Sequence, residues 1–343
     1  MHCYYKRSLV TERLPMRARR SVIAAVAIAA LATLTGSSAS AQAWGTIASP
    51  GAPSQAAAAA APAVSALSFS FTGLVDHAAS GVGLRNMGQG VIRLRGVPVT
   101  AQAEAGILYF GIICNGPCPF SQVVNFQGNP VTGIKIATAT QPCWFGTEYG
   151  AYSVDVTPLL SSPINDDYFV DSVPSNLTDG SDPWVTPGTS APLAEGASLV
   201  VVYSDPSLSP GIVYVNDGAV FFFGTVDIDN PVSPPLPGSS RKFTAIGADG
   251  QVGTSTAATP SISGEKTLIG PSGGSLTQIS GPNSTQNQDS DWNGHDGVPL
   301  NQLWDTNTHS FIGILPAGTT SYRVEYQSFG DCMDWTAHVL TAR

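Results

Sequence analysis

Two short stretches, Leu67-Ser68-Phe69-Ser70-Phe71 and Gly90-Val91-Ile92-Arg93-Leu94, carry the pattern that decides the fold. In such stretches every second side chain points to the same face, as in a β-strand with one apolar and one polar face. Gly, Pro, Asn and Asp separate these stretches along the chain, and helical periodicity persists nowhere for more than a turn or two after the N-terminal leader. The sequence therefore predicts an all-β protein built from antiparallel sheets.

Further strands are predicted wherever apolar and β-branched residues lie between such turn residues. No repeat of 20 to 50 residues recurs along the chain, which argues against a solenoid or a propeller. Two packed antiparallel sheets fit better, and we predict a jelly-roll-like β-sandwich with many loops. The predicted strands cover residues 107–114, 131–137, 149–156, 168–173, 198–204, 211–215, 219–226, 241–246, 265–269, 275–280, 310–314, 321–327 and 335–340.

The N-terminal region has the three parts of a secretory signal peptide. Arg17, Arg19 and Arg20 precede an apolar run over 22–34, and small residues follow up to Ala43. We predict a signal peptide over 1–43, with the first 15 residues arising from an upstream start codon. An Ala- and Pro-rich disordered linker is predicted over 44–66. One β-sandwich domain is then expected over 67–343, with any sub-boundary near the proline-rich segment 229–238.

Charge and location follow from that leader. It holds six of the fifteen basic residues and one of the twenty-four acidic ones, so cleavage leaves nine basic and twenty-three acidic residues, a net charge of −14. An acidic surface repels phosphate backbones, so nucleic acid is not an expected partner. The apolar run is shorter than a membrane span, so no span is expected after cleavage. We expect a secreted, extracellular protein, with the periplasm as the alternative.

Four cysteines remain after the leader, an even number that suits an oxidising compartment. Three pairings are open to them. We favour Cys114 with Cys118 across a tight turn, and Cys143 with Cys332 as a long-range link. A zinc site is the alternative, but the spacing lacks a second pair of ligands.

Three stretches resemble a family of exported bacterial and archaeal cell-surface domains of unknown function, described as DUF3344-like. They are Ile107-Leu-Tyr-Phe-Gly with Val131-Thr-Gly-Ile-Lys-Ile and Pro142-Cys-Trp-Phe-Gly, then Glu195-Gly-Ala-Ser-Leu-Val-Val-Val-Tyr, then Asp331-Cys-Met-Asp-Trp. The resemblance implies an extracellular β-sandwich and no particular chemistry.

The segment Asp289-Ser-Asp291-Trp-Asn293-Gly-His-Asp296 places oxygen side chains at positions 1, 3 and 5, followed by glycine at position 6. This spacing is typical of a loop that wraps a calcium ion. Position 12 is Leu300 and not the bidentate glutamate of an EF-hand, so Asp296 or Asp305 would have to complete the site. The alternative is a solvated Asx-rich turn. The acidic stretch Asp227-Ile-Asp229 could complete the same site or end a strand.

Tryptophans in polar or glycine-rich surroundings are candidates for stacking on sugar rings. The alternative for each ring is a place in the core. The predicted ligand-binding tryptophans are Trp144, Trp292 and Trp304.

Catalysis has little support in the sequence. No Gly-x-Ser-x-Gly or His-Glu-x-x-His motif occurs, so no catalytic residue is assigned. A metal-dependent hydrolase could be built from His295, His309, Asp291 and Asp296, but Asp and Asn oxygens favour calcium. The sequence favours a calcium-stabilised adhesion-type module that binds a surface, a glycan or a protein. A carbohydrate-binding module is the alternative, followed by a polymer hydrolase.

Overall fold

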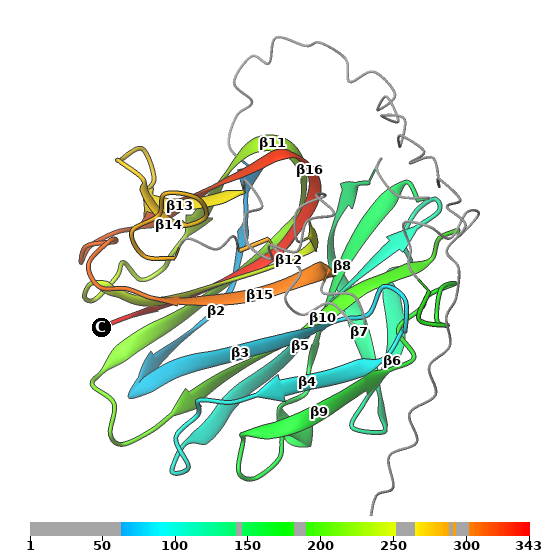
Figure 1. The fold of residues 1–343 in the computed structure, drawn as a ribbon. Coiled ribbons are helices and arrows are strands. Elements are labelled where there is room, and N and C mark those ends of the chain that lie inside the picture. The colour runs from blue at the N-terminus through cyan, green and yellow to red at the C-terminus, as the bar shows by residue number, and fades with distance from the viewer. Residues whose placement is uncertain (1–62, 142–145, 182–189, 252–264, 288–290, 293–301) are drawn as a thin grey trace, which may run out of the picture. The chain divides into compact units, whose positions relative to one another are not determined.

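The computed structural model describes residues 63–141, 146–181, 190–251, 265–287, 291–292 and 302–343. Within these ranges the chain forms β-strands and one 3-10 turn, Thr157–Leu159. The strands pair antiparallel except for the short β1, which runs parallel to its neighbour β11. The structure confirms the predicted all-β, jelly-roll-like sandwich (Figure 1). Among the described residues there is no helix that is long and apolar enough to cross a membrane.

Sheet B contains eight strands, in the order β3-β10-β5-β8-β7-β6-β9-β4. The strands at the two ends of this order, β3 and β4, also contact each other, so the sheet curls around its inner face. Their bounds are β3 Val75–Gly83, β4 Gly90–Leu94, β5 Gln102–Cys114, β6 Ser121–Phe126, β7 Asn129–Thr140, β8 Glu148–Asp155, β9 Asp166–Asp171 and β10 Leu193–Ser204.

Sheet A is built around two long strands, β11 and β16, which pair with each other over most of their length. One end of β16 also pairs with β12, and its other end pairs with β13. The bounds in sheet A are β1 Ala63–Val64, β2 Ala66–Gly73, β11 Gly211–Pro231, β12 Ser240–Gln251, β13 Lys266–Pro271, β14 Thr277–Ser280, β15 Gln302–Ser310 and β16 Ser321–Ala342.

Three large apolar clusters follow from this arrangement. The first lies inside the curl of sheet B and includes Leu108 and Phe110. The second lies between the two sheets, where Val200 and Val202 of sheet B meet Val213 and Val339 of sheet A. The third covers the opposite face of sheet A. Each fully buried aliphatic or aromatic side chain of this size contributes about 1.5–3 kcal/mol, so the stacking of the sheets supplies much of the stability.

Two strand predictions differ from the structure. The segment Asn216-Asp217-Gly218 was expected to be a turn between two strands, but it lies inside the continuous strand β11. The register shifts between Asp217 and Val220, and a Cβ at Gly218 would lie 3.0 Å from the ring of Trp335. The glycine therefore makes room for an indole ring inside a strand. Likewise 321–327 and 335–340 belong to one strand, β16.

The predicted strand 310–314 is wrong. The strand in this region is β15, which ends at Ser310, and bends follow it. Phe311 and Leu315 are buried in the third apolar cluster. Their apolar character therefore reflects loop packing and not strand alternation.

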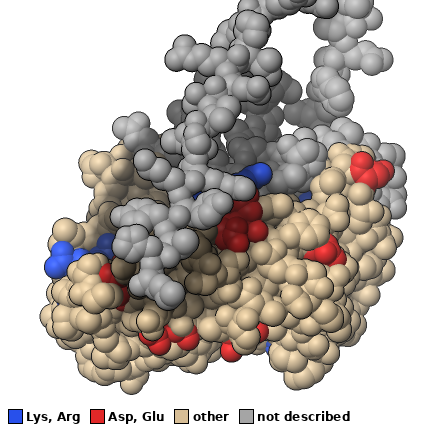
Figure 2. All heavy atoms as spheres, turned by 90° about the horizontal axis from the view of Figure 1, so that it is seen from below, with Lys and Arg blue, Asp and Glu red and all other residues tan. Residues whose placement is uncertain are grey.

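The face in Figure 2 shows mainly uncharged residues, with acidic side chains scattered over it. This distribution agrees with a sequence in which only 11% of residues are charged.

Candidate functional site

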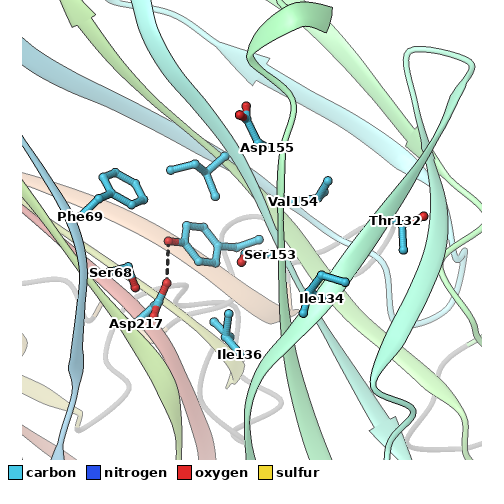
Figure 3. A pocket seen from close by; sticks show the side chains of 11 residues that line it. Ser68, Phe69, Thr132, Ile134, Ile136, Ser153, Val154, Asp155 and Asp217 are labelled. Atoms are coloured by element: carbon cyan, nitrogen blue, oxygen red, sulfur yellow. Dashed lines mark hydrogen bonds between the residues drawn. The ribbon is translucent and has the colours of Figure 1, made fainter.

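A groove opens between the two sheets, with a volume of about 390 Å³. Strands β2 and β11 of sheet A form one wall, and β5, β7 and β8 of sheet B form the other (Figure 3). Most of its surface is apolar. The apolar lining comes from Phe69, Ile107, Ile134, Ile136 and Val154.

The groove contains a carboxyl group, that of Asp217, which is 6% exposed. Asp217 precedes the register shift in β11 and faces sheet B, where the Tyr109 hydroxyl donates to its Oδ2 at 3.0 Å (Figure 3). Burial raises the pKa of Asp217, and hydrogen bonds from Ser68 and Tyr109 offset only part of that increase. Burial and the neighbouring carboxylate together raise the pKa of Tyr109 well above 10.

A second carboxyl group, Asp155, lines the groove from the end of β8. It accepts hydrogen bonds from the backbone N–H and the hydroxyl of Thr157, at 2.8 and 2.6 Å, and is exposed. The described lining residues include no lysine, arginine or histidine. The groove is therefore apolar with two acidic groups, a surface that disfavours anions.

A second polar cluster joins the sheets without forming a groove. The Arg85 guanidinium, just after β3, binds Glu195 of sheet B and lies 2.5 Å from Oδ1 of Asp249 in sheet A. Gln141 donates to the other Asp249 oxygen at 2.7 Å. Burial raises the pKa of Glu195 well above its usual value, although Arg85 lowers it. All four side chains are buried, so this cluster connects the sheets and offers no access to a ligand.

Among the predicted calcium ligands, Asp289, Asn293 and Asp296 lie outside the described residues. Asp291 is buried, and its Oδ1 lies 2.6 Å from Nε2 of His309. Burial alone would raise the pKa of Asp291 and lower that of His309. Their mutual attraction reverses both shifts, so the pKa of Asp291 falls and that of His309 rises. In the described part of the chain Asp291 therefore already has a cationic partner, and no cluster of three metal-ligating side chains is found there.

The hydrolase site considered from the sequence is not assembled by the described residues. Asp291 and His309 meet, but His295 and Asp296 lie outside the described ranges. The hydroxyl groups of Thr267 and Ser280 lower the pKa of Asp291 further. Both members of the pair are buried.

Two of the three predicted sugar-stacking tryptophans are core residues. Trp292 is 1% exposed and makes edge contacts with Phe222 and Tyr326. Trp304 is fully buried between the sheets, where its Nε1 donates to the Ser198 hydroxyl at 2.9 Å. Neither ring offers a face to a sugar in this structure. Trp144 lies outside the described residues.

The disulfide between Cys114 and Cys118 is confirmed, with an S–S distance of 2.05 Å. It closes the short turn that follows β5. Cys332 is disulfide-bonded as well. Its predicted partner, Cys143, lies outside the described residues, so that pairing stays a prediction.

The acidic stretch Asp227-Ile-Asp229 lies inside strand β11 and does not end it. Both carboxylates project from β11 toward the neighbouring strand and bind Arg323, at 3.1 Å for Asp227 and 2.9 Å for Asp229. These are cross-strand ion pairs near the surface of sheet A. Such partly exposed pairs contribute little to stability, typically about 0–1 kcal/mol.

Sequence reasoning missed Asp217 and Tyr109. Asp217 was hidden in a segment that has the composition of a turn, and Tyr109 in an apolar strand. The available signal was an acidic residue flanked by Val213, Val215 and Val220, which predicts a buried carboxyl if the strand is continuous. Only the pairing of the two sheets shows which residues meet it.

No family model matches this chain, and no curated protein matches it in sequence. Two solved structures with partial similarity come from a virus. One is the atomic structure of Sulfolobus Turreted Icosahedral Virus, at 12% identity, covering 80% of this chain and 90% of that one, with a TM-score of 0.22. The other is the crystal structure of the STIV MCP, at 10% identity, covering 80% and 96%, with a TM-score of 0.21. Similarities this weak carry no argument about what this chain does.

Proposed function

We propose that this protein is a secreted, adhesion-type β-sandwich module that binds a surface, glycan or protein partner through the groove between its sheets. The observation that carries the proposal is the groove itself, where apolar walls surround the buried Asp217 carboxyl group. Concave apolar sites with a few polar groups and a carboxyl of raised pKa are the usual form of a binding site.

Two features support secretion. The N-terminal leader has basic, apolar and small-residue segments in the order of a signal peptide. The Cys114–Cys118 disulfide fits an oxidising compartment outside the cytosol. The DUF3344-like resemblance agrees with a cell-surface role.

Calcium remains part of the proposal for the loop around Asp289, Asn293 and Asp296. Because Asp291 is bound to His309, its carboxylate would have to exchange that partner to bind a cation. A melting temperature that is the same with calcium and with excess chelator would remove calcium from the proposal.

The neutral fluorescent probe N-phenyl-1-naphthylamine tests whether the groove binds ligands. We expect its fluorescence to rise and saturate with the purified protein, because the apolar walls exclude water from the probe. Ile134 lines the groove and is 43% exposed, so Ile134→Trp should fill the site and weaken binding while the fold is kept.

Val123→Trp is the matched control. Val123 is 58% exposed on the neighbouring strand β6 and does not line the groove. Probe binding that is absent from the wild type, or equally strong in both variants, would contradict the proposed site.

A further inference from the structure

The charge of Asp217 is balanced differently from that of the buried acids Glu195 and Asp291. Glu195 binds Arg85, and Asp291 binds His309. Asp217 has only hydroxyl donors, Tyr109 and Ser68, and no cation of the described chain pairs with it. Removing a carboxylate from water without an opposite charge is costly, so natural proteins rarely keep such a group in an apolar site without a use for it.

The lining of the groove indicates which kind of ligand could pair with the Asp217 carboxylate. Hydroxyl groups of Ser68, Thr132 and Ser153 add hydrogen-bonding capacity, and the remaining walls are aliphatic or aromatic. An ammonium group donates three hydrogen bonds and brings the missing positive charge. The rings of Phe69 and Tyr109 in the same lining can add cation–π attraction.

The size and polarity of the groove also restrict what is attached to the cation. Apolar walls gain free energy by covering methylene groups, as they do for the stems of lysine side chains. A strongly hydrated inorganic cation would leave these walls in contact with water. An anionic ligand would be repelled by Asp217 and Asp155, both of which line the groove.

We propose that the groove binds a primary ammonium group on an unbranched apolar stem, with the nitrogen at the Asp217 carboxylate and the stem along Ile107, Ile134 and Val154. This inference rests on the proposed function of the groove as the binding site. The same chemistry has two sources, a free alkylamine or a lysine side chain of a protein partner.

Calorimetric titration of the purified protein with n-hexylammonium, n-hexanol and hexanoate tests the charge preference. The three probes share one stem and differ in the head group. Because a hydrogen bond to a charged group is stronger than a neutral one, we expect hexylammonium to bind roughly 10- to 100-fold more tightly than hexanol. Hexanoate should bind more weakly than either. Equal affinities for the amine and the alcohol would overturn the ammonium assignment.

The variant Asp217→Asn removes the charge and keeps the size and the acceptor for Tyr109. We expect this variant to bind hexylammonium no more tightly than hexanol. Its affinity for hexanol should equal that of the wild type. Asp167→Asn, on β9 and half exposed, is the matched control and should keep the preference. If Asp217→Asn keeps the preference as well, another group binds the ammonium and the assignment is wrong. Should the variant fail to fold, the wild-type comparison of amine with alcohol still decides.

The two sources are separated by a lysine-containing tripeptide and its Nε-acetylated form. Tighter binding of the tripeptide than of hexylammonium points to a protein partner, and the reverse points to a small amine. If the acetylated peptide binds as tightly as the unmodified peptide, the ammonium assignment is wrong. If hexanol and N-phenyl-1-naphthylamine also fail to bind the wild type, the groove itself is not a binding site, a result distinct from loss of the amine preference alone.

Discussion

Two regions in which buried carboxyl groups join sheet A to sheet B differ in how the charge is balanced. At Asp249 the carboxylate binds the Arg85 guanidinium and the Gln141 amide, and all three side chains are buried. At Asp217 the carboxyl group receives hydroxyl hydrogen bonds only and faces the groove. The first region contains a cation, the Arg85 guanidinium, beside the buried carboxyl groups of Glu195, Asp249 and Asp334. In the second region no cation of the described residues pairs with Asp217.

If Asp217 has the proposed binding role, the same residue type serves a structural use in one region and a functional use in the other. A completed ion pair in the interior holds two sheets together, and its loss leaves an unbalanced buried charge. A carboxyl group without a cation costs stability in the free protein and can recover that cost when a ligand binds. The following substitutions test whether the two regions behave in these opposite ways.

The largest expected effect is that of Arg85→Met. It leaves Glu195 and Asp249 buried without their guanidinium, and such a change typically costs about 3–5 kcal/mol. Urea unfolding followed by circular dichroism measures it. Arg95→Met is the control, because Arg95 and Asp167 are paired at the surface with side chains 57% and 50% exposed. That variant should lose less than about 1 kcal/mol. Equal stabilities of Arg85→Met and the wild type would show that the guanidinium is not needed.

Asp217→Asn should instead raise the free energy of unfolding at pH 7. The pKa of Asp217 is raised on folding, so its ionisation costs stability once the pH rises above the unfolded value near 3.9. The variant removes that cost and should stabilise the protein at pH 7 by on the order of 1 kcal/mol. The gain should disappear as the pH falls below about 4, where the carboxyl is protonated in both states. Urea midpoints at pH 7 and pH 4 provide the measurement.

Asp249→Asn is the matched substitution in the region around Arg85. Asp249 has a positive φ of 68°, a conformation that asparagine also adopts, so the backbone is preserved. It should destabilise the protein at pH 7, because Arg85 loses one of its two charged partners. The cost should be smaller than that of Arg85→Met, because Arg85 keeps Glu195 and because Asp249 also repels Glu195 and Asp334. If Asp217→Asn and Asp249→Asn shift the stability in the same direction, the contrast between the two regions is wrong.

The smallest expected effect comes from a pair of tyrosines. Tyr109→Phe removes a cross-sheet hydrogen bond to Asp217, and Tyr149→Phe removes one to Thr336. Each should cost about 0.5–1.5 kcal/mol at pH 7. The cost of Tyr109→Phe should shrink at pH 4, because its carboxylate acceptor becomes protonated, whereas the Thr336 hydroxyl does not titrate. Similar pH dependence in both variants would indicate that Asp217 does not ionise.

Much of the fold could be predicted because strand alternation is a local property. In β2 the side chains of Leu67, Phe69 and Phe71 are more buried than those of their neighbours, as the alternation indicates. The continuity of β11 could not be predicted, because Asn216-Asp217-Gly218 has the composition of a turn. Packing against Trp335 and the neighbouring strand overrides that local preference.

The candidate site was largely unpredictable for a related reason. Trp304 has polar neighbours in sequence, yet it packs against Gly196 of the opposite sheet, where a Cβ would lie 2.2 Å from the indole ring. Asp217 and Tyr109 are 108 residues apart and meet only when the sheets stack. Alternation indicates which face of a strand is buried, but it does not indicate which strand lies opposite.

The position of β16 determines how a tensile load would pass through the protein. Over Ala337–Ala342 this strand is hydrogen-bonded to β11 on one side and to β12 on the other. A pull on Ala342 along the strand would act in shear on both ladders at once and would not open them one bond at a time. A force–extension curve with a single high rupture peak would show this resistance.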